Sequence, residues 1–171
     1  MSGFHVRRVD KEVADEAELR WILASASYVT LAMSMDGEPY LVSLSHGYDE
    51  AENCLFFHCA KAGRKMDILK VNNRVWGQAL LDFERSISGG ECTHLYASVH
   101  FGGRVSFLEK REAKRHALRC LARHQGGDTE AMLSRSTPER LDETSVGRID
   151  IEFMTGKKSR EISLQKDARH G

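Results

Sequence analysis

Apolar residues along this chain recur with two different spacings, and the spacing changes several times. From residue 10 to residue 26 they recur every three or four positions, which predicts a helix with Asp10 as its N-cap. Its expected inward side consists of Ala14, Ala17, Leu19, Ile22 and Leu23. Residues 28–35 alternate instead, which predicts a strand with one apolar face made of Val29, Leu31, Met33 and Met35.

A hairpin is expected after that strand, because Asp36-Gly37 is a strong signal for a two-residue turn. The return strand covers residues 39–49, and a short loop leads into a third apolar strand at 54–59. We expect these three strands to form a meander. A helix over 63–71 and a fourth strand over 74–83 follow, and the polar segment 84–92 is predicted to be a loop.

A long strand is expected at 94–108, with Gly102-Gly103 indicating a bulge. Residues 110–124 predict an amphipathic helix with Ala113, Ala117, Leu118 and Leu121 inward. We expect a solvated basic face on its outer side, made of Lys110, Arg111, Lys114, Arg115, Arg119 and Arg123. Residues 125–144 look polar and loosely organised, and 146–156 and 157–164 look like a last pair of strands that turns near Gly156.

Six or seven antiparallel strands joined mostly by short turns therefore dominate the predicted structure. Sheets of this size usually close on themselves, because closure removes unpaired strand edges. With 171 residues the chain is long enough for one well-packed core, so we expect a single domain over residues 1–171. The predicted fold is mainly β, a small barrel with peripheral helices.

Charge and cysteine content narrow the function classes. Lys plus Arg and Asp plus Glu number 25 each, so no overall field favours nucleic acid or a membrane surface, and any anion site must be local. The apolar runs are too short to cross a bilayer, and the first residues lack the pattern of a signal peptide. The four cysteines form no CxxC pair. We therefore expect a cytoplasmic protein with reduced thiols.

The segment FFHCAKAGRK, residues 56–65, carries the densest chemistry. Strand alternation separates His58 from Cys59, and a zinc site needs about four convergent ligands, so no metal is expected here. The turn that follows combines a helix start with Gly63 and with the cations Lys61, Arg64 and Lys65. Unpaired amides, the helix dipole and these charges suit a phosphate group. Taken alone, the same residues also fit an ordinary solvated loop.

Two blocks of the sequence resemble a known family. Residues 36–75, DGEPYLVSLSHGYDEAENCLFFHCAKAGRKMDILKVNNRV, resemble the flavin-binding core of the pyridoxamine 5'-phosphate oxidase-like superfamily, the FMN-binding split barrels. Residues 94–124, HLYASVHFGGRVSFLEKREAKRHALRCLARH, resemble the strand and helix of its branch related to nitroimidazole-resistance proteins. The resemblance implies a split β-barrel that binds FMN in a homodimer.

The same resemblance implies a set of cofactor-binding residues. In the family, the basic pair of the turn holds the FMN phosphate, which corresponds to Arg64 and Lys65, with Lys61 as an additional contact. The strand before GYD runs along the flavin, the third strand reaches its ribityl chain and phosphate, and a strand of the partner chain completes the site. These positions correspond to Leu41, Val42, Ser43, Leu44, Ser45 and His46, to Phe57 and His58, and to Tyr96, Ser98 and Val99.

Departures from the family pattern bear on the reaction. His46 replaces the second basic residue that pyridoxamine phosphate oxidases carry before GYD, and the C-terminus lacks their arginine- and tryptophan-rich ending. We therefore do not expect vitamin B6 oxidation. His58 matches a histidine of the nitroimidazole-resistance branch and is the predicted catalytic residue. An imidazole can bond a phosphate, donate a proton or ligate iron, and the alternative is a purely structural histidine.

The sequence thus favours an FMN-dependent, reductase-like oxidoreductase that uses NAD(P)H or another donor on a small, electron-poor, nitroaromatic-like acceptor. The flavin would carry the redox chemistry, and the protein would orient and tune it. Two alternatives remain open at this point. One is a non-catalytic flavin-binding or storage protein, and the other is a haem-binding split barrel with His58 or His46 as the iron ligand.

Overall fold

The computed structural model describes residues 6–88 and 91–164, with the backbone alone for 84–88 and 91–93. Within these residues, seven strands form one antiparallel sheet in the order β2-β1-β5-β6-β7-β4-β3. They are β1 (Val29–Met35), β2 (Glu38–Leu44), β3 (Gly47–Asp49), β4 (Cys54–Cys59), β5 (Arg74–Ser88), β6 (Glu91–Phe107) and β7 (Ser145–Lys158). A short 3-10 turn η1 (Val9–Lys11) precedes helices α1 (Glu16–Ser25), α2 (Arg64–Val71), α3 (Arg111–His124), α4 (Thr129–Ser134) and α5 (Pro138–Glu143).

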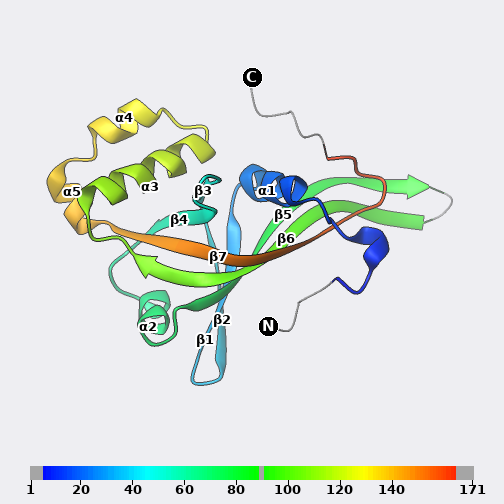
Figure 1. Cartoon of the computed structure of the whole chain (residues 1–171), viewed down its shortest axis with the longest axis horizontal. Coiled ribbons are helices and arrows are strands. Elements are labelled where there is room, and N and C mark those ends of the chain that lie inside the picture. Colours follow the sequence, from blue (N-terminus) through cyan, green and yellow to red (C-terminus); the bar gives the residue numbers. More distant parts are fainter. Residues whose placement is uncertain (1–5, 89–90, 165–171) are drawn as a thin grey trace.

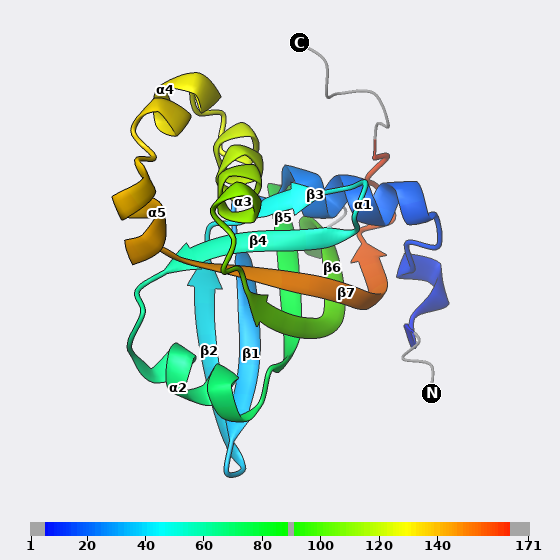
Figure 2. The same cartoon turned by 60° about the vertical axis from the view of Figure 1, so that its left-hand side comes forward.

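The sheet curls around a single main core, which confirms a split barrel with peripheral helices. Leu31 on β1 and Phe57 on β4 come from strands near opposite ends of the sheet, yet both are buried in the same cluster. Ile68 from α2 and Phe101 from β6 complete this interior. Helix α1 covers another side of the sheet, whereas α3, α4 and α5 gather beyond β3 and β4 (Figures 1 and 2).

The hairpin at Asp36-Gly37 forms as predicted, with positive φ values of 54° and 82° and with Met35 opposite Glu38. The predicted meander of three strands is wrong. The return strand breaks at residues 45–46, so β2 pairs with β1, whereas β3 turns away and pairs with β4. The buried His46 side chain accompanies this break, which sends consecutive strands to opposite ends of the sheet.

Two boundaries in the first half of the chain also differ from prediction. Asp15, and not Asp10, is the N-cap of α1, since its carboxylate accepts the Ala17 N–H at 2.9 Å. Asp10 instead forms ion pairs with Arg8 and Arg160. The predicted loop at 84–92 is wrong as well, because β5 and β6 continue through it as one long hairpin, with residues 89–90 outside the description.

The bulge at Gly102-Gly103 is confirmed by a register shift between β6 and β7. The last pair of strands is wrong, because β7 runs unbroken through Gly156. A Cβ at Gly156 would lie 2.3 Å from the Leu19 side chain, and the Gly156 carbonyl accepts the Val13 N–H at 3.0 Å. This glycine therefore permits a close approach of the N-terminal segment and does not form a turn.

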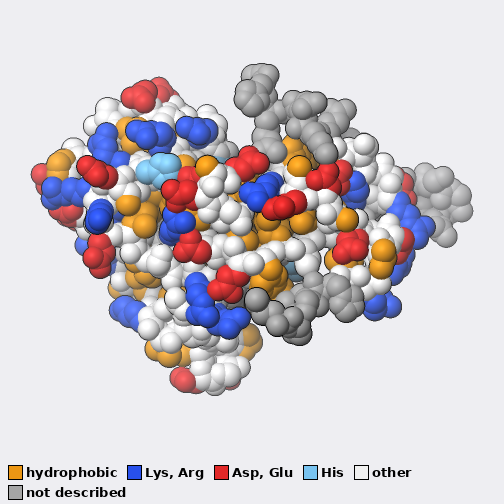
Figure 3. Space-filling view, in the orientation of Figure 1, with side chains coloured by type: hydrophobic (Ala, Val, Ile, Leu, Met, Phe, Trp, Pro, Cys, Tyr) orange, Lys and Arg blue, Asp and Glu red, His pale blue; other side chains and the backbone are white. Residues whose placement is uncertain are grey.

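Helix α3 confirms the predicted inward side in part and corrects the basic face. Ala117 and Leu121 are buried, but so is Lys114, whose ammonium group donates to the Leu141 and Thr144 carbonyls at 2.7 and 2.9 Å. The segment predicted to be loosely organised contains α4 and α5. Basic side chains do gather over α3 on the face drawn in Figure 3. Within the described residues, no helix is long and apolar enough to span a membrane.

Candidate functional site

The junction between β4 and α2 concentrates unpaired positive charge. Gly63, with φ of 121°, begins the helix, and no side chain caps its N-terminus. Within the described residues, the backbone N–H groups of Arg64 and Lys65 have no hydrogen-bond partner, and neither side chain forms an ion pair with a carboxylate. An uncapped helix start beside cations that no carboxylate neutralises is able to bind an anion.

Two ring contacts fix where this junction lies in the barrel. The Arg64 guanidinium lies over the Tyr40 ring of β2, 5.6 Å from its centroid. The Lys65 ammonium lies over the Phe57 ring of β4 at 5.4 Å. Figure 2 shows the chain descending from β4 to α2 along the side of β2. The cationic turn and the outer edge of β2 therefore form one continuous surface.

Strand β2 is the end of the sheet, so one of its backbone edges is unpaired among the described residues. Leu41 is 65 % exposed, the Ser43 side chain is exposed on the same side of the strand, and Ser45, just past the end of β2, is exposed as well. Val42 and Leu44 are half-buried and pack against the main core. A planar ligand with donors and acceptors along its rim could pair with this edge as an added strand does.

His58 projects from β4 on the opposite side from the core and is exposed. It opens onto a cleft of about 410 Å³ between β4 and the late helices. The cleft is lined by Ser45, His58, Leu118, Leu121, Ala122, Gln125, Met132 and Thr144. Its wall is mainly apolar, so the free energy of desolvation would be small for a small, uncharged, flat molecule that enters it.

Sequence reasoning identified Ser45 and His58 but missed the wall that faces them. Leu118, Leu121, Ala122 and Gln125 follow one another at helical spacing on α3. Leu118 and Leu121 belong to the predicted inward face, whereas Ala122 and Gln125 do not, and only the folded chain shows that the end of this face borders a cleft. Met132 comes from α4, a helix that was not predicted.

His46 lies in a different environment from the other predicted residues. Its side chain is fully buried, Nε2 lies 3.0 Å from the Leu23 carbonyl, and the ring lies 4.1 Å from that of His124. Burial, together with the charge of His124, lowers the pKa of His46 to about 4. His46 is therefore neutral near pH 7 and supplies no positive charge for a phosphate.

The residues predicted to act from a partner chain lie on β6, which β1 and β5 separate from β2. Ser98 and Val99 are buried, and Tyr96 is half-buried with Lys11 over its ring at 6.0 Å. Phe57, also a predicted contact, is buried below Lys65. Within one chain, Tyr96 is thus distant in sheet order from the β2 edge, and its role at a shared site stays a prediction.

Comparisons with known proteins give the chain its family. A family model described as pyridoxamine 5'-phosphate oxidase matches residues 15–158. A candidate 5-nitroimidazole antibiotic resistance protein from Bacteroides thetaiotaomicron is 25 % identical, with a TM-score of 0.77 and 86 % of each chain covered. No protein among the curated sequences matches.

Two further solved structures share the fold at lower identity. A flavocytochrome from Azotobacter vinelandii has a TM-score of 0.76 at 19 % identity, covering 94 % of this chain and 75 % of its own. An FAD- and haem-binding protein from Mycobacterium smegmatis has a TM-score of 0.75 at 21 % identity, covering 91 % and 76 %. With the model match spanning most of the sequence, the chain belongs to the pyridoxamine 5'-phosphate oxidase family.

Proposed function

We propose that this protein binds FMN and acts as a reductase-like oxidoreductase on a small, electron-poor acceptor. The observation that carries the proposal is the joining of an uncapped, cationic helix start to an open strand edge by the contact of Arg64 with Tyr40. A phosphate at the turn and a ring system along β2 are the two ends of a flavin mononucleotide. Residues 41–45 span about 13 Å, enough for a fused three-ring system.

The basic residues have distinct parts in this proposal. Arg64 and Lys65 lie at the helix start and would donate charge-assisted hydrogen bonds to phosphate oxygens, together with their own backbone N–H groups. Lys61 is exposed and close enough to Asp142 to lower the pKa of that carboxyl, after the larger effects of Arg111 and Lys114. Lys61 would therefore add charge at the rim, partly shared with Asp142.

The cleft next to His58 is the proposed acceptor site. When bound, the flavin supplies hydride or electron transfer, with a reduced nicotinamide as the proposed donor. His58 would hydrogen-bond the acceptor or give it a proton, while Leu118 and Leu121 exclude water from its apolar face. A nitroaromatic acceptor fits this lining, because it is flat, weakly solvated and a hydrogen-bond acceptor at its edge.

Oligomeric state and location are also proposals. Leu80 and Phe83 leave apolar surface on β5 exposed, at 47 % and 38 %, and a second copy packed there would cover it. We propose a homodimer in which β6 of each chain completes the other chain's site, with the half-buried Tyr96 facing the partner and the buried Ser98 and Val99 holding the strand in place. A cytoplasmic location would suit the reduced thiols at Cys54, Cys59 and Cys120.

Flavin titration tests the proposal. We expect Arg64→Ala and Lys65→Ala each to weaken FMN binding about tenfold to hundredfold, since a charge-assisted hydrogen bond contributes roughly 1.5–3 kcal/mol. Lys70→Ala is the matched control, because Lys70 is an exposed cation in the last turn of the same helix. Equal affinities in all four proteins would refute the phosphate assignment.

Titration and absorption spectra of the same purified protein distinguish between the candidate cofactors. FMN and FAD are titrated side by side, because one similar structure is an FAD- and haem-binding protein. A Soret band in the isolated protein would favour haem, and His58 at the apolar cleft would then be the first axial ligand to test. Bleaching by NAD(P)H and reoxidation by a nitroaromatic support the reductase, and a flavin that stays oxidised supports a storage protein.

A further inference from the structure

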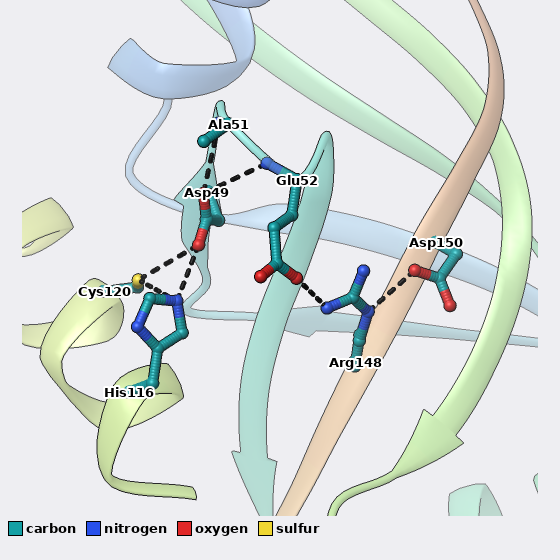
Figure 4. Close-up of polar contacts among 7 residues, drawn as sticks. All are labelled: Asp49, Ala51, Glu52, His116, Cys120, Arg148 and Asp150. Atoms are coloured by element: carbon teal, nitrogen blue, oxygen red, sulfur yellow. Dashed lines mark hydrogen bonds and ion pairs between the residues drawn. The ribbon is translucent and has the colours of Figure 1, made fainter. Parts of the chain in front are cut away.

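Three side chains of different chemistry converge on one point between β3 and α3. The Asp49 carboxylate lies 2.6 Å from His116 Nε2 and 4.0 Å from Cys120 Sγ, and the latter two atoms lie 3.6 Å apart. Figure 4 shows the three side chains pointing toward one another. All three ligand atoms fall within 4.8 Å of each other. The arrangement is independent of the flavin site proposed above.

The scaffold around this cluster is rigid. His116 and Cys120 are four residues apart on α3 and therefore share a face of the helix. Gly47 at the start of β3 packs so closely on α3 that a Cβ there would lie 2.5 Å from the Leu121 nitrogen. The second Asp49 oxygen accepts the N–H groups of Ala51 and Glu52 at 3.1 and 3.3 Å. The carboxylate is thus already oriented toward α3.

The geometry differs from that of a catalytic triad. In a triad, one imidazole nitrogen faces the thiol and the other faces the carboxylate. Here the same atom, Nε2 of His116, faces both Asp49 and Cys120. Burial also raises the pKa of the Cys120 thiol, whereas a nucleophilic cysteine needs a lowered one. Convergence of three ligand atoms on one point is the geometry of a metal site.

Apart from its contact with His116, Asp49 takes no part in the ion pairs beside it. Arg148 binds Glu52 on one side and Asp150 on the other, so it is occupied by those two carboxylates (Figure 4). Asp49 alone among these acids faces α3. Although burial acts to raise the pKa of Asp49, its hydrogen bonds with His116 and with the Glu52 and Ala51 amides lower it. The carboxylate is therefore ionised and available as a ligand.

We propose that Asp49, His116 and Cys120 bind a divalent transition-metal ion, with Zn²⁺ the best match to one oxygen, one nitrogen and one sulfur ligand. Tetrahedral zinc separates such ligand atoms by about 3.3–3.5 Å. The 3.6 Å between Cys120 Sγ and His116 Nε2 is near that spacing. The 4.0 Å between Cys120 Sγ and Asp49 must shorten, and the 2.6 Å contact of Asp49 with His116 must open. The ion replaces the thiol proton and any proton on Nε2, and both protons leave to solvent.

Three protein ligands leave a fourth position for water or a small ligand. Cys120 also lines a cavity of about 320 Å³ together with Tyr48, Glu50 and His124, so there is room next to the cluster. The Phe56 ring meets His116 edge-on at 5.7 Å and limits its rotation. A bound ion would cross-link β3 to α3, the helix whose later turns line the His58 cleft.

Cobalt titration tests the site. Tag-free, chelator-treated protein is titrated with Co²⁺ and then with Zn²⁺, and visible absorption is followed at wavelengths beyond the flavin bands. We expect one equivalent of tetrahedral Co²⁺, displaced by Zn²⁺. Asp49→Asn and His116→Ala should each weaken binding at least about tenfold, and Cys120→Ser should also remove the cobalt–thiolate charge-transfer band. Circular dichroism establishes that each variant is folded.

Cys59→Ser is the matched control, because Cys59 lies on the other face of β4 and contacts Met66 at 3.7 Å. It should bind Co²⁺ as the wild type does. If Cys120→Ser does not fold, the His116→Ala variant alone tests the proposal, since the His116 side chain is 46 % exposed and we expect the protein to fold without it. Absence of the tetrahedral spectrum, or its persistence in folded His116→Ala protein, would overturn the proposal.

Discussion

Gly47 and Leu121 bring β3 and α3 together at backbone distance. A Cβ at Gly47 would stand 2.5 Å from the Leu121 nitrogen and 2.8 Å from its Cα, so the helix rests directly on the strand. Leu121 also lines the His58 cleft, and Cys120 beside it faces Asp49. One contact thus positions both the proposed acceptor site and the proposed metal site.

We therefore expect Gly47→Ala to lower the free energy of unfolding by about 1–3 kcal/mol, because the clash is with backbone that cannot rotate away. Urea denaturation followed by circular dichroism measures the loss. Gly127→Ala is the control, since a Cβ there would lie at an ordinary 3.5 Å from its nearest neighbour. Equal stability of the two variants would show that α3 can shift away from β3.

Much of this architecture follows from sequence periodicity alone. Alternation correctly placed Leu31 inside and separated His58 from Cys59, and the Asp36-Gly37 signal gave the right turn. These features depend on neighbours along the chain. Such local rules determine which way a side chain points from its own strand.

The errors share a different cause, because each depends on contacts between distant segments. Gly156 leaves space for the Leu19 side chain, and Lys114 donates hydrogen bonds to the carbonyls of Leu141 and Thr144. No local pattern tells a glycine that permits close packing from one that makes a turn. The Asp49, His116 and Cys120 cluster is similar: the spacing of His116 and Cys120 is visible in the sequence, but their meeting with Asp49 is not.

Lys114 gives a second stability prediction. Lys114→Met keeps much of the length of the side chain but leaves the Leu141 and Thr144 carbonyls without their donor, so we expect a loss of about 2–3 kcal/mol. Arg115→Met, at the exposed neighbouring position, should change the free energy of unfolding little. Thermal unfolding of both variants measures the difference. A Lys114→Met protein as stable as Arg115→Met would show that water replaces the ammonium group.

The buried His46 should make the stability of the fold sensitive to acid. Its pKa falls from an ordinary 6.5 to about 4 on folding, so between these values the unfolded chain binds more protons than the folded one. The contribution of neutral His46 to the free energy of unfolding is therefore fully present above pH 6.5. It is lost as the pH falls from 6.5 to about 4, by roughly 3 kcal/mol in total. Burial lowers the pKa of His124 as well, which adds to the effect.

Denaturant unfolding between pH 4 and 8 measures that slope. His46→Gln removes the titrating group and keeps a side-chain donor for the Leu23 carbonyl, so its stability should vary less with pH than that of the wild type. An identical slope in the variant would assign the acid sensitivity to other groups.

His58→Ala should separate chemistry from cofactor binding. His58 lines the apolar cleft and not the cationic turn, so FMN affinity should change less than about twofold. Turnover of a nitroaromatic acceptor should fall by about a hundredfold if the imidazole donates a proton. His100→Ala on β6 is the histidine control, and stopped-flow reoxidation of the reduced flavin is the measurement. Unchanged turnover in His58→Ala would make the histidine structural.

The strand that carries His58 has its long partner far along the chain. Cys54 pairs with Asp150 and His58 with Val146, whereas the other partner of β4 among the described residues is the three-residue strand β3. Contacts this distant in sequence are slow to form. During synthesis the β1–β2 and β5–β6 hairpins can form as they emerge, but the cleft beside His58 must wait until β7 has left the ribosome. Truncation before residue 158 should therefore abolish the site while leaving local hairpins intact.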